Sequence, residues 1–222
     1  MTDLPARRAA AADVLRPAEA GGKGNERMYM TSEFEPQARF AAVVYDETLD
    51  VDAIFAEAVA ILRRQGVVVA GLLQRFGERL SNGKRAMWLD NIATGAEIRL
   101  DRPRGPGATA CVLDPDALAR AACVLRRAVE AEPDLIVANR FGHAEAEGRG
   151  TRTEIADAIC SGTLVLTAVR YTLLMDLEGF LGAPPHLLLP SAGSIVSWVQ
   201  DQLADRGLHA GFPSSWLDAA PG

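Results

Sequence analysis

The hydrophobic pattern of the chain alternates between short apolar runs and longer segments with helical spacing. The first run, Phe40 to Tyr45, is followed by a segment from Val51 to Gln65 whose apolar residues recur every three or four positions. A second apolar run follows from Val67 to Leu73. Short charge-free runs are typical of buried strands, and the three-to-four spacing is typical of helices. This order predicts a βαβ unit with two parallel strands.

The middle of the chain departs from this alternation. The segments 85–92 and 96–100 flank the turn Ala93-Thr-Gly95, which predicts a β-hairpin. Asp101 to Ala108 holds two prolines and two glycines, and it predicts a loop.

A second helix is predicted after this loop. Asp114 followed by Pro115 is typical of a helix N-cap with proline at the first helical position, and the helix is expected to run to Ala131. Its predicted buried face consists of Leu118, Ala122, Leu125 and Val129.

The rest of the chain continues the alternation of strand and helix. The predicted elements are a strand at 135–138, a helix at 151–160, a strand at 164–169, a helix at 171–181, a strand at 187–189 and a helix at 194–203. The fold class that follows is α/β, with three layers, a mainly parallel sheet and one added hairpin. We expect a single domain over residues 39–204, with weakly structured tails at 1–38 and 205–222.

The composition of the chain argues against some classes of partner. The chain has 222 residues, 49% of them hydrophobic, which suffices for one globular domain with a sizeable core. Its formal net charge of -6 without a basic block argues against nucleic acid as a partner. The chain shows neither an apolar run of about 18 residues nor a secretory signal, so we expect a cytoplasmic protein without a membrane partner.

The cysteines suggest neither a metal site nor a disulfide framework. Cys111, Cys123 and Cys160 are scattered and odd in number. We interpret them as reduced core thiols and predict no metal site from them.

A polar segment after the strand at 135–138 predicts a ligand site. Residues 139–150 contain two arginines, a histidine, two glutamates and three glycines. Ligands of open α/β sheets bind at the carboxyl ends of the strands. Arg75 and Arg170 follow two other strands, so we expect them to converge with Arg140 on one crevice that suits phosphate or another oxyanion. The predicted ligand-binding residues are Gln74, Arg75, Asn139, Arg140, Gly142, Glu147, Gly148, Arg149, Gly150 and Arg170.

Two alternatives to this interpretation stay open. The arginines can instead pair with glutamates 145, 147 and 154 of the same region. His143 and Glu145 are the candidate catalytic residues if the protein is an enzyme, with either as a base, although a loop histidine bonded to a backbone carbonyl is the simpler interpretation of His143. The sequence identifies no cofactor.

The run from Asn139 to Gly150, N-R-F-G-H-A-E-A-E-G-R-G, resembles the signature of an uncharacterised bacterial domain-of-unknown-function family. That family typically has N-[KR]-F-G-x-x-E-A-E-G-R-G at this place, and the resemblance covers most of 40–182. Its members are often encoded near molybdate ABC-transporter genes, and some are labelled as molybdenum-transport ATP-binding proteins. The resemblance therefore implies molybdate, or a nucleotide related to the molybdenum cofactor, as the ligand class.

More distantly, the layout is similar to that of P-loop nucleoside-triphosphatases. The resemblance places Asn139 and Arg140 where that class has its Walker B acids, and His143 where it has a lysine. The first predicted βα turn, Tyr45 to Asp52, has four acids and neither glycine nor lysine, so the Walker A loop is absent. The resemblance thus implies the fold without its phosphate-binding loop, and it argues against that class's catalysis.

The function expected from the sequence is binding of a small oxyanion or of a phosphorylated or nucleotide ligand at the strand ends. One alternative is an atypical nucleotide hydrolase or phosphotransferase. Another is a scaffold, with a partner or homodimer contact through the hairpin at Met87-Trp88 or the helix that carries Trp198.

Overall fold

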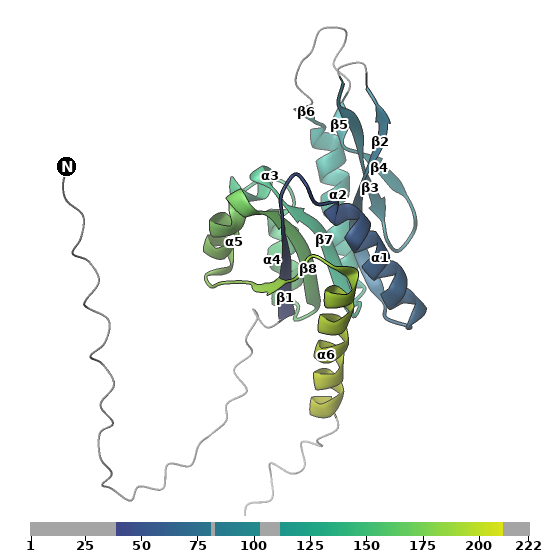
Figure 1. Ribbon diagram of the computed structural model, residues 1–222, viewed down its shortest axis with the longest axis vertical. Helices are drawn as coiled ribbons and strands as arrows, with labels where there is room; N and C mark the ends of the chain where they lie inside the picture. Colours follow the sequence, from purple (N-terminus) through teal and green to yellow (C-terminus); the bar gives the residue numbers. More distant parts are fainter. Residues whose placement is uncertain (1–38, 81–82, 103–111, 211–222) are drawn as a thin grey trace, which may run out of the picture. The chain divides into compact units, whose positions relative to one another are not determined.

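One seven-stranded sheet organises the fold. The computed structural model describes residues 39–80, 83–102 and 112–210 (Figure 1). The strands of the sheet are β1 (Phe40–Tyr45), β2 (Val69–Arg79), β3 (Arg85–Asn91), β4 (Glu97–Arg99), β7 (Leu135–Phe141), β8 (Leu164–Arg170) and β9 (His186–Leu188). Their order is β4-β3-β2-β7-β8-β1-β9. The strands from β2 to β9 in this order are parallel, and β3 and β4 extend the sheet as an antiparallel hairpin.

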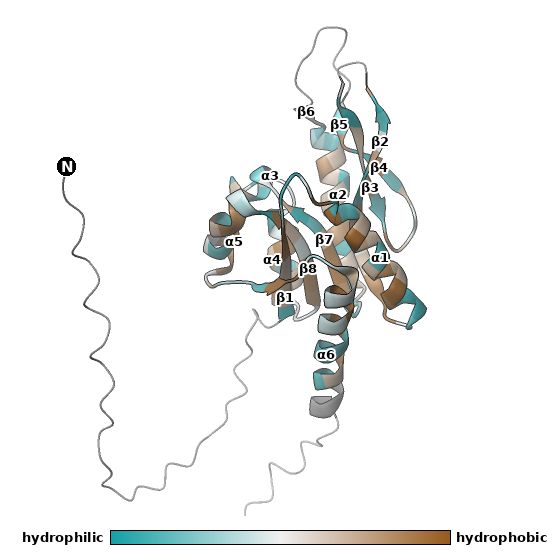
Figure 2. Cartoon of the chain, viewed as in Figure 1, coloured by the Kyte–Doolittle hydropathy of each residue, from teal (hydrophilic) through white to brown (hydrophobic). Residues whose placement is uncertain are grey.

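Helices cover both faces of the sheet and give a three-layer arrangement. Helices α1 (Val51–Arg64) and α6 (Ala192–Ala210) pack on one face, and α2 (Pro115–Glu130), α4 (Arg152–Cys160) and α5 (Leu174–Leu181) pack on the other. Alternate residues of the parallel strands β1, β2, β7 and β8 supply the two cores, as the pleat requires. The central strands β1 and β8 are correspondingly hydrophobic in Figure 2. Among the described residues, no helix has the length and apolar character needed to span a membrane.

The strand and helix pattern expected from the sequence is largely confirmed. β1 has the predicted bounds, and α1 ends at Arg64, one residue before the predicted end. The hairpin is present as β3 and β4. Asp114 caps α2, because its carboxylate accepts a hydrogen bond from the Asp116 backbone N–H at 3.1 Å. The expected three-layer α/β fold with a mainly parallel sheet is therefore correct.

The apolar face predicted for α2 is confirmed in part, because Leu118 and Val129 pack against the core without being fully buried. Leu125 is buried, but Leu118, Ala122 and Val129 are only partly buried. The buried stripe instead consists of Ala117, Ala121, Leu125 and Ala128. A stripe made mostly of alanine lets the helix pack closely on the sheet, and it leaves Leu118 to border a pocket described below.

Several boundaries also differ from the predictions. Asp101 and Arg102 form β5, which pairs with β6 (Val112–Leu113), rather than the start of a loop. Helix α6 continues to Ala210, past the predicted boundary at residue 204, whereas the expected tail at 1–38 lies outside the described residues. The glycine-rich segment contains a short helix, α3 (His143–Ala146), which the sequence pattern did not indicate.

The prediction of core thiols is wrong for the two described cysteines. Cys123 and Cys160 are exposed rather than core thiols, since both lie on the outer sides of their helices, and Cys111 lies outside the described residues. Trp198 is buried in the core, and the partner contact through its helix α6 stays a prediction.

Candidate functional site

The candidate site lies where β2 and β7 separate. The two strands pair in parallel from Val69 with Leu135 to Leu72 with Ala138. Beyond this point β2 continues to Arg79 with β3 as its partner, while β7 remains beside β8. The separation opens the sheet at its carboxyl edge.

Asn139 produces the separation. It has a left-handed backbone (φ 55°), and the register of β7 with β8 shifts between Val137 and Arg140. Asparagine tolerates this conformation better than most residues. Its side-chain Oδ1 accepts a hydrogen bond from the Gln74 backbone N–H at 2.8 Å, which replaces the ladder bond that β2 loses there. The role of Asn139 in the fold is therefore to end the pairing of β2 with β7.

A pocket of about 330 Å³ occupies this opening. Its wall comes from β2, the hairpin, α2 and β7, and consists of Leu72, Met87, Leu89, Leu100, Leu118, Ala121 and Ala138. Its polar end consists of Gln74, Asn139, Arg140, His143, Glu145 and Thr151, with Gly142 and Ala144 beside them. The volume lies at the lower end of the range of roughly 300–1,000 Å³ found for small-molecule sites, which are likewise mostly apolar with a few polar groups.

Glu145 organises the loop at the polar end of the pocket. Its buried carboxylate accepts hydrogen bonds from the Gly142 backbone N–H (3.0 Å), the Thr151 backbone N–H (3.0 Å) and the Thr151 hydroxyl (3.2 Å). Arg152 donates to the Glu145 carbonyl oxygen at 2.9 Å. Both carboxylate oxygens thus accept hydrogen bonds that hold the loop together, so Glu145 positions this loop beside the pocket.

His143 is the exposed ionisable group of the pocket. It begins α3, and the structure records no hydrogen bond for its imidazole within the described residues. Both ring nitrogens are therefore available to a ligand.

Arg140 joins the pocket to a second cavity. Its Nε and Nη2 bond the Asp52 carboxylate at 3.3 and 2.7 Å, and its Nη1 donates to the Tyr45 hydroxyl at 2.7 Å. These contacts use three of the five guanidinium N–H groups, which leaves two donors. Burial raises the pKa of Asp52, although the hydrogen bond and charge of Arg140 act in the opposite direction.

The second cavity, of about 440 Å³, lies at the β1–α1 loop, where the resemblance to nucleoside-triphosphatases would put a phosphate. It is lined by Tyr45, Asp46, Glu47, Thr48, Leu49, Asp50, Asp52, Phe76, Arg140 and Arg170. Asp50 caps α1 by accepting from the Ala53 N–H at 3.1 Å, as expected for an acid at a helix start. Across the described ranges, no group of three or more His, Cys, Asp or Glu side chains is arranged to hold a metal ion.

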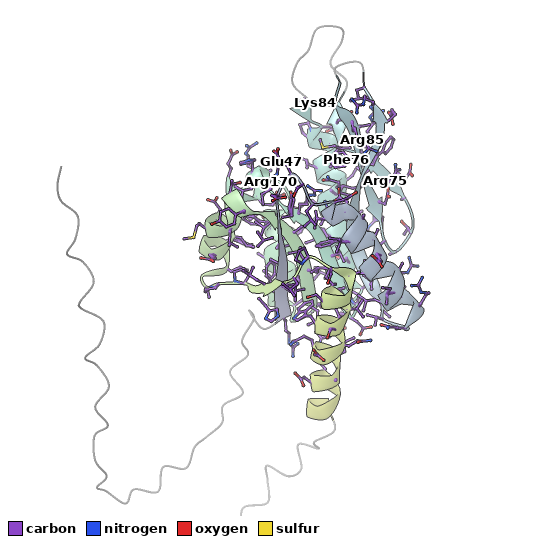
Figure 3. All side chains as sticks on the ribbon, in the orientation of Figure 1. Glu47, Arg75, Phe76, Lys84, Arg85 and Arg170 are labelled. Atoms are coloured by element: carbon purple, nitrogen blue, oxygen red, sulfur yellow. The ribbon has the colours of Figure 1, made fainter. Side chains whose placement is uncertain are left out.

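The predicted meeting of three arginines is only partly present. Arg140 and Arg170 both line the second cavity, but Arg75 lines neither cavity. Arg75 instead pairs with Asp90 at 2.8 Å and with Glu97, and it lies over the Trp88 ring on the hairpin. Figure 3 shows Arg75 with the hairpin residues, away from Arg170.

The last residues of the glycine-rich segment, 147–150, also lie outside the lining of the pocket. Glu147 and Arg149 are exposed and pair with each other, as the alternative interpretation expected of neighbouring charges. Neither they nor Gly148 and Gly150 line the pocket. Of the predicted residues, the pocket brings together Gln74, Asn139, Arg140, Gly142, His143 and Glu145.

The apolar wall was absent from the sequence predictions. Met87 and Leu89 lie two positions apart on β3, and Leu118 and Ala121 lie three positions apart on α2. These spacings put each pair on one face of its element, which is the signal that could have indicated a shared wall.

Three comparisons place the chain among known proteins. The family described as "Protein of unknown function (DUF2478)" matches residues 40–198. The chain is similar to "Molybdenum import ATP-binding protein ModC 2" of Bradyrhizobium diazoefficiens, at 36% identity over 170 residues. This match covers 77% of the chain but 19% of the relative, so the chain spans about a fifth of that protein's length.

Among solved structures, the chain is similar to a human cancer-related nucleoside triphosphatase. The TM-score is 0.51 at 15% identity, over 79% of this chain and 100% of the human one. At this identity the similarity shows the fold alone, and it confirms the expected nucleoside-triphosphatase-like α/β architecture.

Proposed function

Since the chain belongs to the DUF2478 family of proteins of unknown function, we propose its function from its own pocket: it binds a small phosphorylated ligand of nucleotide type at the carboxyl ends of β2 and β7. The observation that carries this proposal is the division of the pocket into an apolar wall and one polar end. A planar base fits the wall, and a phosphate fits the polar end.

The apolar wall favours an organic ligand over a bare oxyanion. Molybdate, sulfate or phosphate would leave the leucine and methionine side chains of the wall in contact with water. A ligand that covers them gains about 25 cal/mol for each Å² of apolar surface removed from water. A bare oxyanion gains nothing from this surface.

Three groups can bind the phosphate at the polar end. Arg140 retains two N–H donors, and charge-assisted hydrogen bonds from a guanidinium to phosphate are among the strong ones. His143 is exposed and unbonded within the described residues. The Gln74 side chain lies within 3.5 Å of Asp52 beside Arg140, and it too lines the pocket.

The comparisons support the choice of ligand class. The name of the Bradyrhizobium relative describes ATP binding and molybdenum import, and the human structure is described as a nucleoside triphosphatase. Both descriptions concern those proteins. They make nucleotides the first ligands to test here and molybdate the second.

A thermal-shift screen tests the proposal. The ligands are nucleoside mono-, di- and triphosphates, phosphate, sulfate and molybdate, each with and without magnesium. Because a ligand that binds only the folded state stabilises it by about 2.7 kcal/mol at one hundred times its Kd, at least one nucleotide should raise Tm by roughly 5–10 °C at such a concentration. The bare oxyanions should raise Tm less.

A matched pair of histidine variants locates the binding. His143→Ala removes an exposed side chain of the polar end and should reduce the nucleotide-induced shift. His186→Ala removes a histidine that stacks on Trp198 at the far edge of the sheet and should leave the shift unchanged. A shift of equal size in both variants, or a larger shift with molybdate than with any nucleotide, would contradict the proposal.

A further inference from the structure

The polar end of the pocket opens toward an acidic loop. The β1–α1 loop and the first turn of α1 contribute Asp46, Glu47, Asp50 and Asp52 to the neighbouring cavity, and the cations there are Arg140 and Arg170. Arg140 lines both cavities, so a group bound to its free donors lies at the boundary between them.

Both arginines of the second cavity are already paired with carboxylates. Arg140 forms a two-point ion pair with Asp52, and Arg170 pairs with Glu47 at 3.3 Å. Figure 3 shows Glu47 and Arg170 side by side at this edge of the sheet. Their positive charges are therefore offset before any ligand binds.

The other two carboxylates bond to the backbone. Asp46 accepts from the Thr48 backbone N–H at 2.8 Å and from the Thr48 hydroxyl at 2.6 Å, and Asp50 accepts from Ala53. The hydrogen bonds to Thr48 lower the pKa of Asp46 and keep it ionised. The structure pairs neither carboxylate with a cation among the described residues, so the loop is net negative.

We infer that this loop limits the proposed ligand to one phosphate group, so that the pocket selects a nucleoside monophosphate over a diphosphate or triphosphate. The inference rests on the proposed function. A first phosphate meets the free donors of Arg140, with Gln74 and His143 beside it. A second and a third phosphate enter the acidic cavity and meet Asp46, Asp50 and Asp52, where like charges repel.

Calorimetric titration with one nucleoside carrying one, two or three phosphates tests this inference in magnesium-free buffer. At low salt, the affinity should fall by roughly threefold to fivefold with each added phosphate, the effect of a nearby exposed charge. Added salt screens exposed charges, so the difference between the monophosphate and the triphosphate should become smaller at high salt.

Variants that each remove one negative charge from the loop test whether the loop causes the difference in affinity. Asp50→Asn keeps a good N-cap for α1, and Asp52→Asn keeps one of the two oxygens that accept from Arg140. Each should raise the affinity for the triphosphate more than the affinity for the monophosphate. The control Glu57→Gln removes an exposed acid of α1 that lines neither cavity, and it should change neither affinity.

The possible outcomes distinguish the proposed nucleotide site from the inferred limit to one phosphate group. The limit to one phosphate group is overturned if the wild-type protein binds the triphosphate most tightly. It is also overturned if neither aspartate variant reduces the difference in affinity between the monophosphate and the triphosphate. In both cases the pocket remains a nucleotide site. If no phosphorylated form binds, the proposed function and the limit to one phosphate group both fail.

Discussion

Glu145 holds the polar end of the pocket in place. Its carboxylate bridges the start of α3, through Gly142, to the residue before α4, Thr151. The chain between them turns back through Gly148 and Gly150, both with positive φ. A buried carboxylate that accepts hydrogen bonds from two backbone N–H groups and a hydroxyl fixes the loop around it. Gly148 and Gly150 thus allow the turn of the loop, and neither lines the pocket.

Gly150→Ala and Gly148→Ala should differ in their effect on the free energy of unfolding. A Cβ at Gly150 would overlap the Glu145 carboxylate and displace it from Thr151, whereas a Cβ at Gly148 meets nothing within 4 Å. Both variants suffer the left-handed backbone penalty of roughly 1–2 kcal/mol. Gly150→Ala should cost about 1–3 kcal/mol more, the cost of unsatisfied buried groups.

Urea unfolding of the two glycine variants and the wild type checks this difference. Equal losses of unfolding free energy in the two variants would mean that Glu145 does not hold the loop.

Single carboxylates also join the elements of the fold. Asp52 connects α1 to β7 through Arg140. Asp101 in β5 accepts from the Met87 backbone N–H at 2.9 Å and pairs with Arg99 at 3.0 Å. Burial dominates at Asp52 and raises its pKa. Burial is also the largest single effect at Asp101, but the hydrogen bonds from Arg99 and Met87 and the charge of Arg99 act against it, and the pKa of Asp101 is lowered.

The two carboxylates should therefore have opposite pH dependence in stability. The folded state favours the charged form of Asp101, so its contribution is complete well above pH 3.8 and is lost as the pH falls through its lowered pKa. The folded state disfavours the charged form of Asp52. The resulting loss of stability is therefore complete above the raised pKa of Asp52, and it disappears as the pH falls through that pKa.

At pH 7 we expect Asp101→Asn to lower the free energy of unfolding by about 1–3 kcal/mol. Asp52→Asn should leave it unchanged or raise it. Both differences should shrink in urea unfolding below pH 3.8, the ordinary carboxyl value. A loss in Asp52→Asn at pH 7 that matches the loss in Asp101→Asn would show that the ion pair with Arg140 outweighs burial.

The strands could be predicted from the sequence because each is a short apolar run of consecutive residues. β1 and β8 are continuous apolar runs, and each has the sequence bounds expected to within one residue. The buried face of α2 was not predictable in this way. Periodicity favours large apolar residues such as Leu118, whereas close packing buries Ala117 and Ala121.

Only the part of the candidate site that follows β7 could be predicted from the sequence. The segment after this strand carries Arg140 and His143 in one continuous stretch of sequence. The opposite wall depends on how β2 pairs with β3 and on the turn at Asn139, which are tertiary features. Arg75 shows the same limit, because its cross-strand neighbour is Trp88 and its partners lie on β3 and β4.

At the scale of the whole molecule, the candidate site lies at the carboxyl edge of the sheet, where open α/β sheets generally bind their ligands. The position that holds a phosphate loop in nucleoside triphosphatases is acidic here. The opening between β2 and β7 replaces it as the candidate site. The fold therefore has the architecture of that class, and the proposed ligand lies in the pocket beside α2 and the hairpin instead of at the first βα turn.

Mapping of backbone amide chemical shifts during titration with a nucleoside monophosphate tests this relocation most directly. The account predicts the largest shifts at residues 138–145, together with Met87 and Leu89 of β3, and small shifts at 46–52. Largest shifts at 46–52 would instead place the phosphate at the first βα turn. That result, or no shift at 138–145, would contradict the account.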